Sequence, residues 1–282
     1  MFIPLHDANA LRHIRLQYVT LVIIVLNCAI WLVFAAAGAN DPQATRAAFF
    51  SYGFVPAVAN GYEALPPEWV VLPGPAAYVT YAFLHGSFMH LAGNMLFLWV
   101  FGDNVEDAIG HFRFVFFYLA CAAAGAFAHS LAEPASVSPL IGASGAAAGI
   151  IAAYLLLHPH VKVWILAFGR FPLRIPAMWV IGAWILFQIA NFIFGSSEQV
   201  SWAAHVGGIV AGAALLPILK RPGVALFDRL PAGGPPVPPP PPAAPAQTAA
   251  PPDDGRLRPI DAPRDSAVAP APPTPWGRQR RD

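Results

Sequence analysis

Six apolar runs separated by polar segments dominate the first 221 residues. They cover residues 17–38, 88–104, 112–131, 144–157, 175–194 and 200–219. A helix needs about 20 predominantly apolar residues to cross the hydrocarbon core of a bilayer. The pattern therefore predicts an all-α polytopic membrane domain, a bundle of six transmembrane helices within residues 1–221. The fourth run is short and begins at a serine, which membrane helices tolerate where an end faces protein or a water-filled cavity.

Composition supports a membrane domain followed by a different kind of segment. Only 11% of the 282 residues are charged, whereas soluble domains average about 25%. Residues 222–282 hold 18 of the 31 prolines and no long apolar run. Such a segment buries too little apolar surface to offset its ordering entropy. We expect residues 222–282 to form a disordered, proline-rich tail on the cytoplasmic side.

The basic residues predict the orientation of the bundle, because cytoplasmic loops are enriched in lysine and arginine. With the N-terminus inside, the inner segments contain Arg12, Arg15, Arg113, Lys162, Arg170, Arg174, Lys220 and Arg221, and the outer segments contain only Arg46. Both termini are then cytoplasmic, and the second, fourth and sixth helices run inward from the outer surface. The loop at about residues 39–85 is a long, aromatic-rich outer loop, which we expect to lie at the membrane interface.

Polar residues inside these spans are costly and therefore suggest function. The second span contains His90 and Asn94, the fourth opens at Ser144, and the sixth contains His205. All lie in the first few residues of the inward-running helices, so they should share one depth in the outer leaflet. Glycine and alanine at four-residue spacing in the fourth and sixth spans would let these two helices approach closely.

These residue types fit nucleophilic catalysis. A serine hydroxyl needs a base to take its proton, and His205 is the predicted base for Ser144. Because no acid lies at this depth, a dyad is favoured over a triad. His90, Asn94 and the free N–H groups at the helix start are candidate donors for an oxyanion hole. Gly142 and Gly145 would permit the tight backbone around the serine.

Each feature taken alone has a plainer explanation. Small residues such as those of segment 142–145 often serve helix packing, and a lone histidine is more often packed than catalytic. A transporter would be expected to carry charges at mid-membrane, and these spans have none there. His85 and His90 lack the carboxylate and spacing of a metal motif, and no basic patch indicates nucleic acid. The catalytic hypothesis therefore rests on the occurrence of these polar residues together at one depth of three spans.

At this point the residues resemble a known family. Segments 83–94 (FLHGSFMHLAGN), 102–106 (GDNVE), 142–145 (GASG) and 204–208 (AHVGG) are similar, in this order, to the motifs of bacterial rhomboid intramembrane proteases. The resemblance covers about residues 15–220. It implies that Ser144 is the nucleophile and His205 the base. It implies that His90 and Asn94 bind the oxyanion, and that His85 supports the mouth of the cavity.

The resemblance also implies substrates and location. It implies cleavage of membrane-anchored proteins in or near their transmembrane segment, without metal or other cofactor, in a bacterial inner membrane. The alternative within the family is an inactive membrane-protein binding or quality-control factor, which would lack Ser144 or His205. Some relatives have an aromatic residue four positions after the serine that packs on the catalytic histidine. Here that position is Ala148, so another group must orient His205.

Overall fold

The computed structural model describes residues 2–167, 169–195 and 200–228, which fall within one compact unit. Most of the predicted tail, from residue 229 onward, lies outside the described residues. Of its first residues, Phe227 and Asp228 donate their backbone N–H groups to the carbonyl oxygens of Leu156 and Leu157, at 2.7 and 2.9 Å. The chain therefore continues to contact the bundle after its last helix.

The structure is mostly helical, and each predicted apolar run is a helix. These helices are α1 (Tyr18–Asn40), α5 (Phe88–Ile109), α6 (His111–Ala132), α7 (Ser144–Leu157), α8 (Ala177–Phe194) and α9 (Trp202–Leu219). Helices α1, α6, α8 and α9 are long and apolar enough to cross a membrane, and α7 is a shorter apolar helix. Helix α5 is equally long but ends in a segment with three acidic residues.

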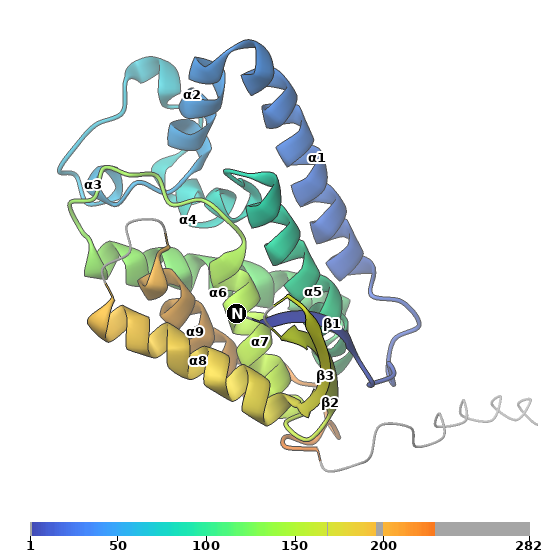
Figure 1. The fold of residues 1–282 in the computed structure, drawn as a ribbon. Helices are drawn as coiled ribbons and strands as arrows, with labels where there is room; N and C mark the ends of the chain where they lie inside the picture. The colour runs from blue at the N-terminus through green and yellow to red at the C-terminus, as the bar shows by residue number, and fades with distance from the viewer. Residues whose placement is uncertain (1, 168, 196–199, 229–282) are drawn as a thin grey trace, which may run out of the picture. The chain divides into compact units, whose positions relative to one another are not determined.

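Helix α7 is the most buried of these helices. It packs against α5, α6, α8 and α9 (Figure 1), and most of its residues are buried. Its sequence is apolar on every face, as expected for a helix surrounded by others. The serine at its first residue is therefore held by the core of the bundle rather than by a peripheral element.

Glycines allow α7 and α9 to touch through their backbones. A Cβ atom added at Gly208 would overlap the carbonyl oxygen of Gly145, and one at Gly212 would overlap that of Gly149. Any side chain at either α9 position would push the two helices apart. The predicted close crossing of the fourth and sixth spans is thus present in the structure.

The long loop after α1 folds into short helices. They are α2 (Pro42–Tyr52), α3 (Pro56–Ala59), η1 (Pro67–Trp69), η2 (Gly74–Ala76), α4 (Ala77–Thr80) and η3 (Tyr81–Phe83). Phe54 is fully buried and pairs through its backbone with Leu140, and the Tyr81 carbonyl accepts the Gly142 N–H at 3.0 Å. This loop therefore holds the segment that leads into α7.

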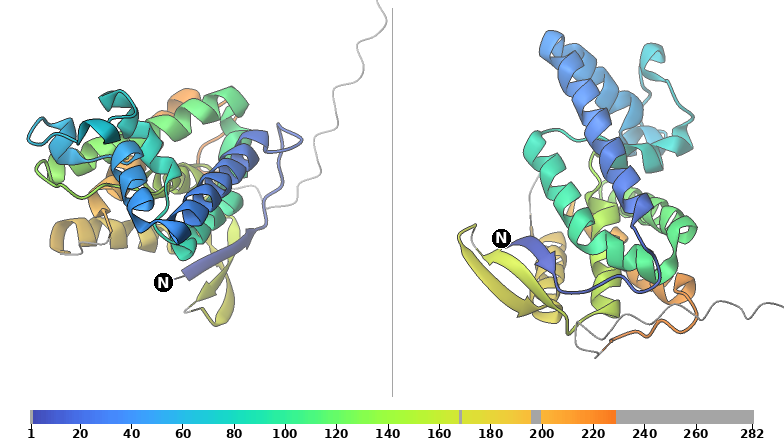
Figure 2. Two further views of the ribbon diagram at one scale, coloured as in Figure 1. Left: turned by 90° about the horizontal axis from the view of Figure 1, so that it is seen from above. Right: turned by 90° about the vertical axis from the view of Figure 1, so that its right-hand side faces the viewer.

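A three-stranded antiparallel sheet corrects the all-α prediction (Figure 2). Its strands are β1 (Phe2–Asp7), β2 (Lys162–Ala167) and β3 (Phe171–Pro176), in the order β1-β2-β3. Val163 and Ile165 are buried whereas Lys162 and Trp164 are exposed, which is the period of a half-buried strand. The alternation is only a few residues long, and the pairing of β1 with β2 is non-local, so the apolar runs gave no sign of it.

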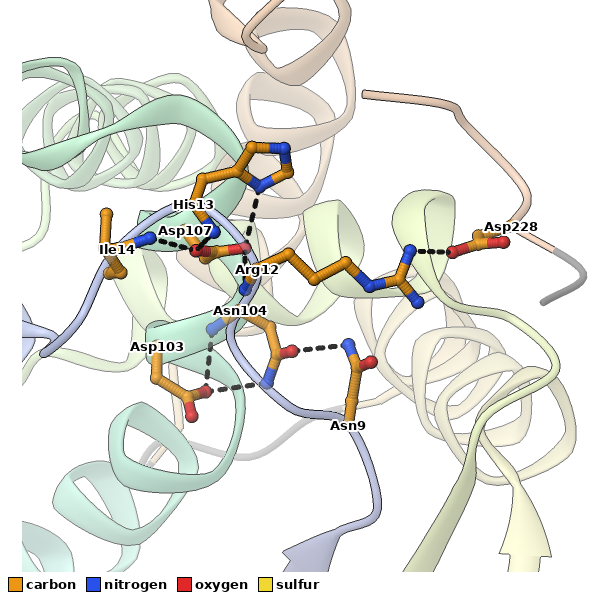
Figure 3. A network of polar contacts seen from close by, with 8 residues as sticks. All are labelled: Asn9, Arg12, His13, Ile14, Asp103, Asn104, Asp107 and Asp228. Atoms are coloured by element: carbon orange, nitrogen blue, oxygen red, sulfur yellow. Dashed lines mark hydrogen bonds and ion pairs between the residues drawn. The ribbon is translucent and has the colours of Figure 1, made fainter. Parts of the chain in front are cut away.

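Two neighbouring carboxylates at the end of α5 hold the segment that precedes α1 and the start of α1 itself. Glu106, fully buried, accepts the N–H groups of Val19 and Thr20 at 3.0 and 2.8 Å, and so caps α1. Asp107 accepts backbone N–H groups of residues 12, 13 and 14 (Figure 3). The acidic residues of segment 102–107 thus have structural partners.

Asp7 of β1 joins the sheet to α7. Its Oδ2 atom accepts hydrogen bonds from the Tyr154 hydroxyl of α7 at 2.8 Å and from Asn104 Nδ2 of α5 at 3.0 Å. Burial raises the pKa of Asp7 from its ordinary value of 3.8 to about 6, despite these hydrogen bonds, because the charged form loses hydration. The ionised form is therefore the costly one in the folded state.

Asp7→Asn is expected to stabilise the protein at pH 8 but not at pH 4. A carboxyl whose pKa is raised on folding contributes stability below pH 3.8 that is lost as the pH rises through about 6. Each pKa unit corresponds to about 1.4 kcal/mol, so the gain at pH 8 should reach about 3 kcal/mol. Thermal unfolding in detergent at both pH values measures it, with the exposed Glu63→Gln as control. An equal effect of Asp7→Asn at the two pH values would contradict this account.

Candidate active site

The loop before α7 presents Ser144 at the first residue of the helix. Ser144 is partly exposed, whereas Ala143 and Gly145 on either side are buried. The helix has no side-chain N-cap. Among the described residues, no acceptor is found for the backbone N–H groups of Ser144 and Gly145. Free N–H groups at a helix start carry partial positive charge, which favours an anion beside the serine.

Gly142 brings this loop against α5. Its φ of +116° lies in the region that glycine favours. A Cβ atom at this position would lie 2.6 Å from both Cε1 and Nε2 of His90 and 3.6 Å from Asn94 Nδ2. The absence of a side chain thus allows His90 and Asn94 to lie directly against the backbone that leads to Ser144.

His85 connects the same groups from the segment before α5. Its Nε2 atom lies 3.0 Å from Asn94 Nδ2 and 3.4 Å from the Ala143 N–H. Because both neighbours can only donate, Nε2 is the acceptor. The rings of His85 and His90 are 5.1 Å apart and nearly perpendicular. One hydrogen of the Asn94 amide is therefore bonded to His85, and the second can bind another acceptor.

His205 lies in the first turn of α9. Ser201 caps this helix by accepting the Ala204 N–H at 3.2 Å. The Nδ1 atom of the half-buried His205 lies 2.8 Å from Oε1 of Gln188, which is buried on α8. Two indole rings flank the imidazole. Trp184 is nearly parallel to it at 6.4 Å, and Trp202 is perpendicular at 6.0 Å.

The neighbours of Ser144 and His205 pack against each other. A Cβ atom added at Gly145 would lie 3.4 Å from the carbonyl oxygen of Ala204. Within the described part of the chain, no hydrogen bond joins Ser144 Oγ to His205. Hydrogen bonds between nucleophile and base are often longer before substrate binds and shorten in the complex. The structure therefore brings the starts of α7 and α9 together, without a hydrogen bond between the two side chains.

The described residues offer no metal site, since no group of three histidine, cysteine, aspartate or glutamate side chains is close enough to hold an ion. The groups that the site brings together are a hydroxyl, an imidazole, an amide and free backbone N–H groups.

Three residues at this site were not among the predicted ones: Gln188, Trp184 and Trp202. Gln188 is a polar residue inside an apolar span, which is a signal for function in itself. However, neither its spacing nor its surroundings in the sequence linked it to His205, because the contact depends on how α8 packs against α9.

The chain is similar to known proteins of one family. A family model described as "Rhomboid domain" matches residues 75–222. "Rhomboid protein 1, mitochondrial" of Saccharomyces cerevisiae is 34% identical over 140 residues, covering 46% of this chain and 38% of that protein. "Rhomboid protease GluP" of Bacillus subtilis is 30% identical over 148 residues, covering 52% of this chain and 26% of that protein.

A plant relative extends the comparison. "RHOMBOID-like protein 5" of Arabidopsis thaliana is 29% identical over 140 residues, covering 49% of this chain and 42% of that protein. The matched stretches thus make up less than half the length of these relatives.

Proposed function

Because the chain belongs to the rhomboid family, we propose that it is an intramembrane serine endopeptidase in which Ser144 is the nucleophile and His205 the general base. The observation that carries this proposal is the backbone contact of α7 with α9 at Gly145 and Gly208. It holds the start of one helix, with its serine, beside the first turn of the other, with its histidine.

The proposed reaction has two steps. Ser144 Oγ attacks the scissile carbonyl carbon while Nε2 of His205 takes the hydroxyl proton. The tetrahedral intermediate collapses, the C–N bond breaks, and His205 gives the proton to the leaving amine. Water, deprotonated by His205, then attacks the acyl-enzyme ester. The C–O bond to Ser144 breaks, His205 returns the proton to the Ser144 oxygen, and the carboxylic acid product leaves and ionises in water. No cofactor is required.

The developing oxyanion would bind next to Gly142. The free N–H group of Ser144, the second hydrogen of Asn94 Nδ2 and the ring of His90 are the candidate donors there. Donors that are fixed before the reaction stabilise the transition state without a reorganisation cost. Gly142 leaves room there for His90 and Asn94, which a Cβ atom would approach to 2.6 and 3.6 Å.

The proposed substrates are membrane-anchored proteins cut in or near their transmembrane segment. A helical peptide bond is shielded by the hydrogen bonds of its own helix, so the segment must unwind before attack. We place the protein in a bacterial inner membrane, with six spans and both termini cytoplasmic. The positive-inside bias of the loops supports this orientation.

Two other functions fit these residues less well. An inactive membrane-protein binding factor would need neither the serine nor the histidine, and this chain has both. A transporter would need a polar path through the bundle. The acidic residues at the end of α5 instead bind the backbone of the N-terminal segment, which leaves them occupied by structure.

Cleavage inside the membrane distinguishes the proposed protease from an inactive binding factor. Purified protein in liposomes is incubated with a single-pass substrate whose transmembrane segment contains a helix-destabilising glycine pair, and mass spectrometry locates the cut. The proposal predicts two fragments with ends in or beside that segment, and slower cleavage when alanines replace the glycines. Stable binding of the substrate without cleavage would support the inactive factor instead.

Asn94→Ala is expected to lower kcat by about 100- to 1000-fold with little change in KM, because an oxyanion donor acts mainly in the transition state. The loss should be at the lower end if His90 and a backbone N–H compensate. Steady-state kinetics on the model substrate measure both constants. The matched control is Asn27→Ala, which removes a buried amide of α1 that donates to the Ile23 carbonyl. A change in KM alone would assign Asn94 to substrate positioning.

A further inference from the structure

The position four residues after Ser144 leaves a space that α8 fills. Ala148 is fully buried, and its small side chain packs with Ala152 and Ile209. Trp184 of α8 packs against this group, and its ring lies over His205 at a centroid distance of 6.4 Å. The aromatic contacts to the histidine are thus made by Trp184 of α8 and by Trp202 of α9, and not by α7.

Gln188 adds a directional contact from the same helix face. It lies one turn after Trp184, and residues four apart on a helix share a face. The Oε1 atom of Gln188 is a carbonyl oxygen, which can only accept a hydrogen bond. Its 2.8 Å contact with His205 therefore requires a hydrogen on Nδ1.

The consequence concerns the other ring nitrogen. A neutral imidazole with hydrogen on Nδ1 has an unprotonated Nε2, and only that nitrogen can accept the proton of a serine hydroxyl. The acceptor on Nδ1 also limits ring rotation. Gln188 is only 3% exposed, so water does not compete effectively for this hydrogen bond.

We propose that Gln188 is the positioning residue of the dyad: it fixes the tautomer and the ring orientation of His205, while Trp184 supports the ring from the side. This inference rests on the proposed function. It gives α8 a catalytic contribution that does not involve contact with substrate.

Kinetics of three variants test the proposal. Gln188→Met keeps the approximate volume but removes the acceptor, and should lower kcat about 10- to 100-fold, the effect of losing one hydrogen bond to a group that becomes charged. KM should stay within about twofold, since the residue does not touch substrate. Gln188→Glu keeps an acceptor oxygen and should recover most of kcat.

The matched control is Asn191→Leu. It removes an amide from the same helix that donates to the Phe187 carbonyl, and kcat should stay near the wild-type value. Wild-type kcat in Gln188→Met, or equal losses in the Met and Glu variants, would overturn the proposal.

A spectroscopic measurement tests it independently of activity. Protein carrying ¹⁵N-labelled histidine is examined by NMR in detergent, with His205→Ala identifying the His205 signals. The proposal predicts a protonated Nδ1 and an unprotonated Nε2 in the resting wild type. The opposite tautomer would refute it, even if Gln188→Met fails to fold. If Ser144→Ala still cleaves, the proposed function fails, while the tautomer still decides the role of Gln188.

Discussion

Replacement of Ser144 or His205 by alanine is expected to abolish cleavage of a membrane-anchored substrate. Because nucleophile and base act in one step, either single change should lower kcat by at least about 10⁴-fold. The double variant should be little worse than either single one, since the second residue has no function without the first.

The controls for this pair are a serine and a histidine outside the site. Ser130 lies on α6 and accepts a hydrogen bond from Asn60, and His160 is an exposed residue after α7. Ser130→Ala and His160→Ala should cleave at nearly the wild-type rate. All variants are compared at equal thermal stability in detergent. Undiminished cleavage by Ser144→Ala would exclude it as the nucleophile.

Gly208→Ala is expected to lose both stability and activity. A single methyl group at this position would overlap the carbonyl oxygen of Gly145, and a backbone atom in the packed core has little room to move. Overpacking in a core costs about 1–3 kcal/mol, and more where the backbone must shift. Separation of α9 from α7 would also move His205 away from Ser144.

Gly182→Ala is the matched control, because this glycine also lies within a helix but a Cβ atom there meets nothing within 4 Å. Alanine has the higher helix propensity, so this variant should be slightly more stable than wild type. Thermal unfolding in detergent and cleavage rate are measured for both variants. A Gly208→Ala protein as stable and as active as Gly182→Ala would show that the helices do not need this close contact.

Much of the fold could be predicted from the sequence, because a helix that crosses a membrane requires a long run of apolar residues. The predicted fourth run, 144–157, coincides with α7, and the other five differ from their helices by a few residues at the ends. The strands were missed because each is short and two of them pair with a segment distant in the chain. A short apolar stretch is compatible with a helix and with a strand, and its periodicity alone does not distinguish them.

The candidate site was partly predictable for a similar reason. Ser144, His90, Asn94 and His205 were visible as polar residues at one end of apolar runs. Gln188 was equally polar, but neither its spacing nor its neighbours in the run 175–194 linked it to His205. Its relation to His205 depends on the rotation of α8 about its axis, which local sequence does not fix. The absence of an aromatic residue at Ala148 raised the question of what orients the histidine, and only the packing of α8 supplied a candidate.

Covalent labelling of the nucleophile tests the central claim most directly. Purified protein is treated with a serine-directed phosphonofluoridate, in which the serine oxygen forms a bond to phosphorus and fluoride leaves, and the adduct is located by peptide mass spectrometry. The account predicts one adduct, on Ser144, and none in His205→Ala, where the base that activates the hydroxyl is missing. An unlabelled Ser144 in the wild type, or equal labelling with and without His205, would contradict it.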